Sequence, residues 1–154
     1  MVPGPTGSGK TPTLYAALSE SVSSTIKVLT VEDPVEYQLE GVNQIPVNPK
    51  RGLGFANGLR AILRQDPDVI MVGELRDLET ISLAISASET GHLVIGTVST
   101  SSAAKTVDRI VDSFPPEEQG RVRAMVSESL TGAITQGLIP GLDGRRMVLA
   151  VEGL

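Results

Sequence analysis

Hydrophobic and polar residues follow helical and strand periods in alternation along the whole chain, with no internal repeat and no low-complexity linker. Short apolar runs that are rich in β-branched residues predict buried strands at residues 26–31, 69–72, 92–98 and 147–151. Helical spacing of apolar residues predicts helices at residues 10–21, 55–63, 78–90 and 103–112. This alternation is typical of an α/β fold with a mainly parallel central sheet flanked by helices.

The remaining stretches predict a less regular segment, a further helix and a turn. Residues 37–47 alternate weakly, which indicates a short hairpin or an irregular excursion. The sequence PPEE at residues 115–118 is a good opening for a helix, with proline in the first turn and carboxylates at the positive end of the dipole. The apolar face of this helix is expected to comprise Val122, Met125, Val126, Ile134 and Leu138. A turn at residues 141–144 precedes the last predicted strand.

Length, composition and charge narrow the class of protein. With 154 residues, of which 40% are hydrophobic, the chain fits one domain, residues 1–154, around one core. A net charge of −5, two tyrosines, two phenylalanines and no tryptophan disfavour nucleic acid as a partner. The lack of cysteine and the single histidine exclude disulfides and a typical zinc site. Because no apolar run approaches the roughly 18 residues of a membrane-spanning helix and no secretory signal opens the sequence, we expect a cytoplasmic protein.

The segment GPTGSGKT at residues 4–11 matches the P-loop pattern GxxxxGK[ST] at every fixed position and precedes a helical pattern. Backbone N–H groups in such a loop surround phosphate oxygens, the lysine reaches the outer phosphates, and the threonine hydroxyl binds Mg²⁺. The sequence therefore predicts that ATP and Mg²⁺ are bound by Gly4, Pro5, Thr6, Gly7, Ser8, Gly9, Lys10 and Thr11. The alternative is a glycine-rich turn that only joins a strand to a helix. Only residues 1–3 stand where a buried strand normally precedes a P-loop.

Two of the predicted strands lead into a carboxylate. The run VIMVGE ends at Glu74 and has the form of a Walker B segment, whose acid lies beside the bound metal. Glu32 follows the strand IKVLTV in the same way, so both carboxylates are expected at the carboxyl edge of the sheet. A carboxylate near the γ-phosphate can orient or deprotonate water. The alternative for each residue is a solvated acid at a strand end.

Taken together, these segments resemble the motor ATPases of type IV pili and type II secretion, and most of all the pilus-retraction type. After the P-loop, residues 30–37 (TVEDPVEY) are similar to the Asp box of that family, residues 64–77 to its Walker B region, and residues 89–93 (ETGHL) to the start of its His box. The retraction type is indicated by residues 101–112 (SSAAKTVDRIVD) and 127–130 (SESL). The resemblance covers nearly the whole chain.

The resemblance implies a RecA-like P-loop NTPase domain, a homohexameric ring, and ATP hydrolysis coupled to the movement of pilin subunits at a pilus or secretion platform of the inner membrane. It also implies roles for single residues. Lys10 and Thr11 hold phosphates and Mg²⁺, Glu74 is the Walker B acid beside the metal, and Glu32 is the catalytic glutamate. His92 takes the first His-box position, and the resemblance makes it a catalytic candidate. A histidine at the start of a strand is otherwise more often structural.

The chain departs from the family pattern at several points. Ser99 stands where the family has a second histidine, and Pro12 stands where it usually has threonine. The family's N-terminal domain, which supplies arginines to the active site, and its terminal helices have no counterpart in residues 1–154, so we expect a C-terminal motor domain trimmed at both ends. The four-cysteine zinc subdomain that is common in the secretion branch is also lacking, which favours the retraction side.

Two functions of different classes follow from this pattern. The first is an enzyme, a Mg²⁺-dependent ATPase in which Glu32 activates water. The second is a nucleotide-binding or assembly module that has the same fold and little or no turnover, because the arginines and the second histidine are lacking. A third, a RecA-like nucleic-acid motor, shares the P-loop but is disfavoured by the acidic charge and the scarcity of aromatic residues.

Overall fold

The computed structural model describes residues 1–142 and 144–154, which group into two compact units. Unit 1 comprises residues 1–14 and 97–154, and unit 2 comprises residues 15–96. Helix α1 (Lys10–Ser21) contributes residues to both units. Whether residues 1–154 act as a single domain stays a prediction.

Unit 2 is built on a four-stranded parallel sheet. Its strands are β1 (Val28–Glu32), β2 (Val42–Pro46), β3 (Val69–Val72) and β4 (Leu93–Gly96), in the order β2-β1-β3-β4. Val28 lies opposite Val42 on one side and Val69 on the other, and every residue of β1 and β3 is buried. The predicted parallel sheet is confirmed. Residues 42–46, for which a hairpin or an irregular excursion was expected, instead form a parallel edge strand.

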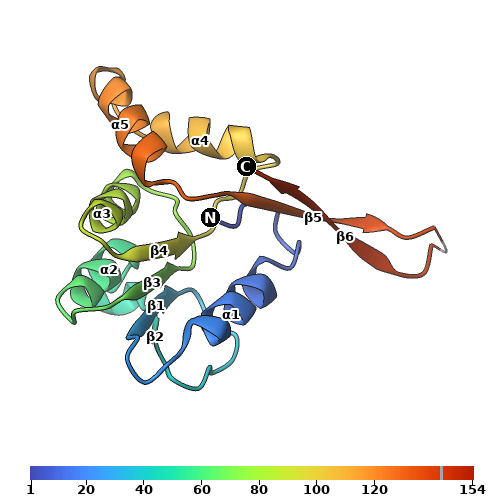
Figure 1. The fold of residues 1–154 in the computed structure, drawn as a ribbon, viewed down its shortest axis with the longest axis horizontal. Helices are drawn as coiled ribbons and strands as arrows, with labels where there is room; N and C mark the ends of the chain where they lie inside the picture. The colour runs from blue at the N-terminus through green and yellow to red at the C-terminus, as the bar shows by residue number, and fades with distance from the viewer. Residues whose placement is uncertain (143) are drawn as a thin grey trace. The chain divides into compact units, whose positions relative to one another are not determined.

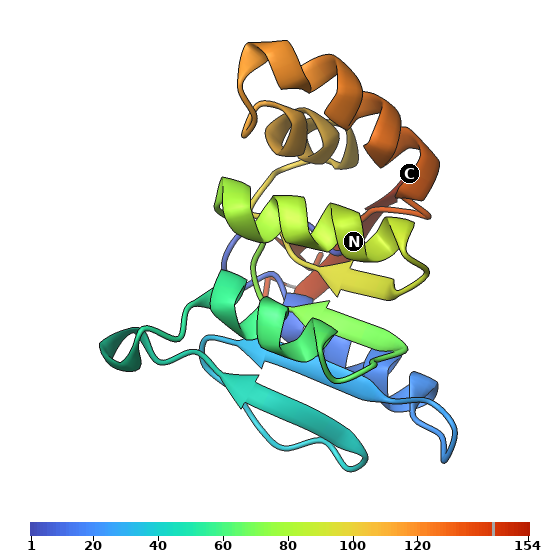
Figure 2. The same ribbon diagram turned by 90° about the vertical axis from the view of Figure 1, so that its left-hand side faces the viewer.

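Helices α2 (Phe55–Leu63) and α3 (Leu78–Glu89) lie side by side on one face of this sheet (Figure 2). A short 3₁₀ helix, η1 (Pro49–Arg51), precedes α2. Gly58 lets α2 approach β1 closely, because a Cβ atom at this position would lie 2.6 Å from Cγ2 of Val31. The carboxylate of Asp77 caps α3 and accepts a hydrogen bond from the N–H of Thr80 at 2.9 Å. Both helices begin and end close to the predicted residues.

Unit 1 combines a helix pair with a two-stranded ribbon. Helices α4 (Ala103–Val111) and α5 (Pro116–Ser129) pack against each other, with Ile110 and Val122 among the buried side chains. Strands β5 (Ile134–Pro140) and β6 (Met147–Gly153) form an antiparallel ribbon (Figure 1). The predicted turn before β6 includes Asp143, which lies outside the described residues; the N–H of Gly144 donates to the carbonyl of Gly141 at 2.9 Å.

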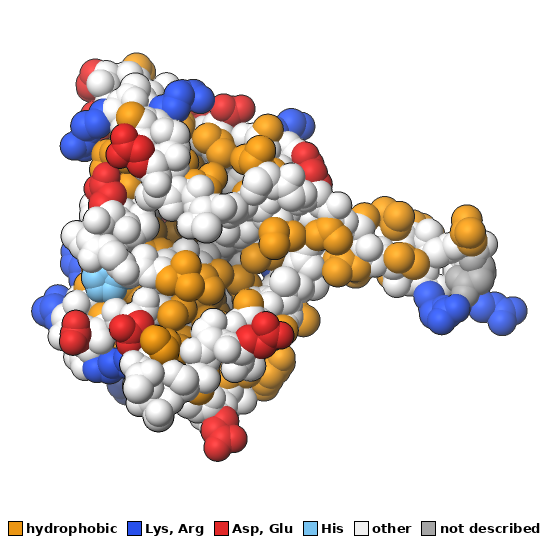
Figure 3. Space-filling view, in the orientation of Figure 1, with side chains coloured by type: hydrophobic (Ala, Val, Ile, Leu, Met, Phe, Trp, Pro, Cys, Tyr) orange, Lys and Arg blue, Asp and Glu red, His pale blue; other side chains and the backbone are white. Residues whose placement is uncertain are grey.

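One part of the predicted α5 is wrong. The helix was expected to continue through Ile134 and Leu138, but it ends at Ser129, and both residues belong to β5. Residues four apart share a face of a helix, but they also share a face of a strand, because four is a multiple of the strand period of two. The pairing of residues 134–140 with residues 147–153 decides for the strand. Many of the exposed large apolar side chains, such as Ile139 and Val148, lie on this ribbon (Figure 3).

The segment that leads into the P-loop lies beside β5. The N–H groups of Ile134 and Gln136 donate to the carbonyls of Met1 and Pro3, each at 2.9 Å, and the N–H of Gly4 donates to the carbonyl of Val98 at 3.1 Å. Proline has no N–H, so Pro3 can accept a hydrogen bond from β5 but cannot donate one. The loop is therefore entered from a segment with strand-like hydrogen bonds, although this segment is not a regular strand.

In the part of the chain that the structure describes, no helix is long and apolar enough to cross a membrane.

Candidate functional site

The P-loop in unit 1 is a tight turn that runs directly into α1. Gly7 and Gly9 adopt φ angles of 79° and 86°, in the left-handed region that glycine enters without the steric cost met by other residues. The N–H of Ser8 donates to the carbonyl of Pro5 at 3.3 Å, and α1 begins at Lys10. The predicted turn and the helix after it are confirmed, and the motif therefore has the local structure that a phosphate-binding loop requires.

Gly4 fixes the base of the loop. Its φ angle is 155°, and a Cβ atom there would lie 2.5 Å from the carbonyl oxygen of Gln136 and 2.6 Å from Oγ of Ser8. These distances are shorter than real Cβ contacts, so the loop can lie this close to β5 only with glycine at this position.

Lys10 folds back over its own loop. Its ammonium group donates to the carbonyl oxygens of Gly4 and Pro5, at 2.7 and 2.8 Å. A lysine ammonium is a compact charge on a flexible stem. It therefore lies at the mouth of the loop on neutral carbonyl oxygens. An anionic phosphate oxygen is a stronger acceptor than these carbonyls and could replace them.

Two polar features of the loop suit an anion. Ser8 is 2% exposed, and its hydroxyl has no hydrogen-bond partner among the described residues. The first N–H groups of a helix have no acceptor within the helix, and the positive end of the helix dipole lies there. Pro12 occupies the third position of α1 and removes one of these donors, but α1 continues unbroken to Ser21, as expected for proline in a first turn.

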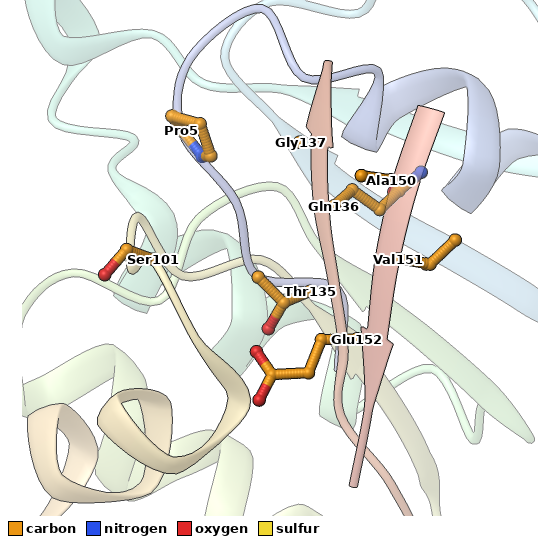
Figure 4. A pocket seen from close by; sticks show the side chains of 8 residues that line it. All are labelled: Pro5, Ser101, Thr135, Gln136, Gly137, Ala150, Val151 and Glu152. Carbon is orange, nitrogen blue, oxygen red and sulfur yellow. The ribbon is translucent and has the colours of Figure 1, made fainter. Parts of the chain in front are cut away.

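A pocket of about 350 Å³ lies beside the loop (Figure 4). Thr135 and Glu152 lie opposite each other in the β5–β6 register and both line it, and Thr135 is 7% exposed with no partner for its hydroxyl in the described residues. Among its lining residues Pro5 alone belongs to the P-loop, and Lys10 is not part of its wall. Its lining comprises Pro5, Ser101, Thr135, Gln136, Gly137, Ala150, Val151 and Glu152.

In unit 2, Glu32 is a buried carboxylate with three side-chain donors. Glu32 is the last residue of β1 and is 3% exposed. Tyr15 donates its phenol hydrogen to Oε2. The hydroxyl of Thr30 and the amide of Gln44 donate to Oε1, at 2.5 and 3.0 Å. Because a buried charge is costly unless hydrogen bonds compensate it, this arrangement is that of a carboxylate held in one orientation, and not of a solvated acid at a strand end.

Tyr15 is itself held in place. Its ring lies edge-on to that of Tyr37, with centroids 4.7 Å apart, and its side chain is 1% exposed. Burial, followed by the hydrogen bond to Glu32, raises the pKa of Tyr15 to about 12. Its phenol therefore remains a donor at every physiological pH.

Glu74 reaches the same edge of the sheet as Glu32. It follows β3 after Gly73, whose N–H donates to the carbonyl of Val31 at 2.8 Å. A Cβ atom on Gly73 would lie 3.3 Å from Cα of Glu32, so the two chain segments are in close contact where the strands end. Glu74 is partly buried. The expectation that the parallel strands place both acids at their carboxyl ends is confirmed by this register.

The structure does not bring His92 to this edge. His92 immediately precedes β4, which runs parallel to β3, so it lies at the opposite end of the strands from Glu32. Its Nδ1 lies 3.0 Å from the carbonyl of Ala87 and 3.2 Å from the hydroxyl of Thr90, at the end of α3. These contacts account for His92 as a residue that closes the turn after α3, and its catalytic role stays a prediction.

Sequence reasoning missed the partners of Glu32. Tyr15, Thr30 and Gln44 belong to α1, β1 and β2, and no motif contains all three. A weak signal was present for Thr30, because it is two residues before Glu32 on a strand and therefore shares its face. Tyr15 and Gln44 lie 17 and 12 residues from Glu32 along the chain, and only the fold brings them together.

Comparison with known proteins places the chain in a family. A family model described as type II/IV secretion system protein matches residues 1–148. The type IV pilus retraction ATPase PilT of Pseudomonas aeruginosa is 54% identical over 153 residues, which cover 96% of this chain and 44% of PilT. The type II secretion system protein E of Xanthomonas campestris pv. campestris is 51% identical over 143 residues, which cover 93% of this chain and 24% of that protein.

A solved structure agrees with these matches. The crystal structure of the pilus retraction motor PilT with bound ADP superposes with a TM-score of 0.92 at 47% identity, over 99% of this chain and 46% of that one. The chain thus spans less than half of the length of each of these relatives. The predicted α/β fold and the resemblance to pilus and secretion motor ATPases are both confirmed. The chain belongs to the type II/IV secretion system protein family.

Proposed function

We propose that this chain binds ATP with Mg²⁺ through its P-loop and hydrolyses it, as the ATPase domain of a pilus or secretion motor. One observation carries the proposal: a complete P-loop in which the ammonium of Lys10 lies on the loop carbonyls and the buried hydroxyl of Ser8 lacks a described partner. The ADP in the related PilT structure supports a nucleotide as the ligand.

The residues present suit a nucleotide and a magnesium ion. Mg²⁺ is usually bound by one or two protein oxygens together with substrate phosphates and water. Thr11 and Glu74 would supply those oxygens. When bound, the ion neutralises charge on the phosphate oxygens.

Phosphate binding and water activation are then carried out by two different groups of residues. Lys10 and the N–H groups of residues 7–11 bind the phosphates and stabilise negative charge as it develops. Glu32 orients the attacking water and accepts its proton, and the carboxylate of Glu74 would help to hold the metal. No step is assigned to His92, because its ring closes the turn after α3.

The assembly of the whole motor is also part of the proposal. We infer a cytoplasmic ATPase that acts as a homohexamer and contacts inner-membrane platform proteins of a pilus or secretion system. Relatives from both systems match this chain at similar identity, so their names favour neither extension nor retraction nor secretion as the task.

A second function, nucleotide binding with little turnover, is favoured by one specific residue. Ser99 stands where the family has a second histidine, so a group able to donate a charged hydrogen bond near the phosphates is lacking at that position. Simultaneous measurement of nucleotide affinity and phosphate release separates the two functions, since the binding module would retain the first and lack the second.

Calorimetric titration with Mg²⁺-ATP tests the P-loop directly. Lys10→Ala should weaken binding by about a hundredfold or more, because charge-assisted hydrogen bonds to phosphate are lost. Lys50→Ala is the matched control, since Lys50 is an exposed lysine of η1 outside the loop. Equal affinity of the parent chain and Lys10→Ala would contradict the proposal.

A further inference from the structure

The hydrogen bonds around Glu32 leave it with a defined open position. An ionised carboxylate offers about four lone-pair sites on its two oxygens. Oε1 accepts from Thr30 and Gln44, whereas Tyr15 is the one donor to Oε2 among the described residues. Both sites of Oε1 are therefore occupied, and the remaining acceptor site belongs to Oε2.

We propose that Tyr15, Thr30 and Gln44 are positioning residues that lock Oε1 of Glu32 and present Oε2 as the atom that accepts the proton of the attacking water. This inference rests on the proposed ATP hydrolysis and deepens it. It assigns the task of orienting one carboxylate oxygen to Thr30, which lies in the segment 30–37, and to Tyr15 and Gln44, which lie outside the recognised motifs.

The orientation of Gln44 is fixed by its own contacts. Its Oε1 accepts from the N–H of Leu39 at 2.8 Å, so its NH₂ group must be the end that points at Glu32. That NH₂ group also donates to the carbonyl of Tyr37 at 3.1 Å. A side-chain amide with both ends satisfied cannot rotate without losing a hydrogen bond, and it holds Oε1 of Glu32 rigidly.

Tyr15 constrains the other oxygen. Its phenol oxygen accepts from the N–H of Glu36, with the two atoms N and O 3.3 Å apart. It also lies 3.3 Å from the amide nitrogen of Gln44, which has only two hydrogens for three acceptors and therefore shares one of them with Tyr15. With its acceptor sites engaged in this way, its own hydrogen is directed at Oε2 of Glu32. The three side chains thus form one connected network, in which loss of a single member should turn the carboxylate.

The contact can be tested without any turnover. The chain has two tyrosines and no tryptophan. In the variant Tyr37→Phe, Tyr15 is therefore the one remaining tyrosine, and no tryptophan emission overlaps with its fluorescence. A phenol that donates to a carboxylate loses emission by proton transfer in its excited state. In the Tyr37→Phe chain, Glu32→Gln should therefore raise the emission of Tyr15 severalfold at neutral pH. Unchanged emission would overturn the network.

The functional half of the proposal needs kinetics. Tyr15→Phe, which keeps the ring, should lower kcat about tenfold, the size expected for one hydrogen bond to a charged group, and leave the affinity for Mg²⁺-ATP unchanged. In a Glu32→Gln background the same change should have no further effect on kcat. Tyr37→Phe is the control. It keeps the ring that packs against Tyr15 and removes only the hydroxyl of Tyr37, so it should leave kcat unchanged.

The outcomes distinguish this inference from the function on which it rests. Equal slowing by Tyr15→Phe in the parent and in the Glu32→Gln background would overturn the positioning role, because the effect would not pass through Glu32. A parent chain that binds ATP and releases no phosphate would contradict the proposed hydrolysis and the catalytic meaning of the network together. In that case the comparison of tyrosine emission with and without Glu32→Gln still reports whether Tyr15 donates to Glu32.

Discussion

The P-loop and the surroundings of Glu32 hold charged groups by opposite means. The ammonium of Lys10 donates to backbone carbonyls of residues 4 and 5, within six positions along the chain, and the loop tip at residues 5–7 is exposed. Around Glu32 the partners are side chains from three different elements, and the carboxylate is 3% exposed. An exposed loop of backbone groups suits reversible capture of a ligand. A buried and fully oriented carboxylate suits an act in the transition state.

The largest expected effect separates turnover from binding. Glu32→Gln removes the proton acceptor but keeps nearly the same shape, so phosphate release should fall by on the order of a hundredfold or more. Nucleotide affinity should stay within a few-fold, because the P-loop is untouched. Phosphate release under saturating Mg²⁺-ATP, measured beside a calorimetric titration, checks both numbers. An unchanged rate would transfer the catalytic role to another acid.

The next effect concerns the loop alone. Pro12→Thr restores an N–H in the first turn of α1 and frees Thr11 from the restriction that a following proline places on its backbone. A charge-assisted hydrogen bond is worth roughly 1.5–3 kcal/mol, so affinity for Mg²⁺-ATP should rise about ten- to a hundredfold. Pro12→Ala restores the N–H without the hydroxyl and should give most of the gain. If neither variant binds more tightly than the parent, the loop already compensates for the proline.

These two sites also differ in how far the sequence predicted them. Patterns within a few consecutive residues predict the P-loop, α2, α3, β1 and β3. For these elements the sequence therefore predicted the correct kind of structure. Strand β5 was assigned to a helix because its four-residue spacing fits both periods, and its pairing with β6 is set by distant residues. Gln44 and Tyr15 carry no local mark of their task, since their contact with Glu32 exists only in the folded chain.

A pair of glycine variants distinguishes close packing from backbone conformation within the loop. Gly4→Ala, at a φ angle of 155°, also places a Cβ atom 2.5 Å from the carbonyl oxygen of Gln136, whereas Gly7→Ala meets no described atom within 4 Å and only the cost of its φ angle of 79°. We expect Gly4→Ala to lower the free energy of unfolding by about 2–4 kcal/mol and Gly7→Ala by about 1 kcal/mol. Urea denaturation measures both. Equal losses would show that β5 moves to admit the methyl group.

The last effect is a change in pH dependence. The pKa of Tyr15 is raised from 10.0 to about 12, chiefly by burial and then by its hydrogen bond to Glu32. Between these values the folded chain keeps a proton that the unfolded chain releases, so the free energy of unfolding falls as pH rises through this window. Below pH 10 the contribution is complete. Urea denaturation across the window should show a shallower fall for Tyr15→Phe than for Tyr37→Phe.

The division of labour between the two sites is tested most directly by combining one variant from each. The double variant Pro12→Thr, Glu32→Gln should bind Mg²⁺-ATP as tightly as Pro12→Thr and release phosphate as slowly as Glu32→Gln, because changes at independent sites add in free energy. Affinity and phosphate release are measured on the same four chains, the parent, the two single variants and the double variant. If Glu32→Gln abolishes the gain in affinity from Pro12→Thr, or if Pro12→Thr restores the rate lost with Glu32, then ligand capture and turnover do not belong to separate groups of residues, and the account is wrong.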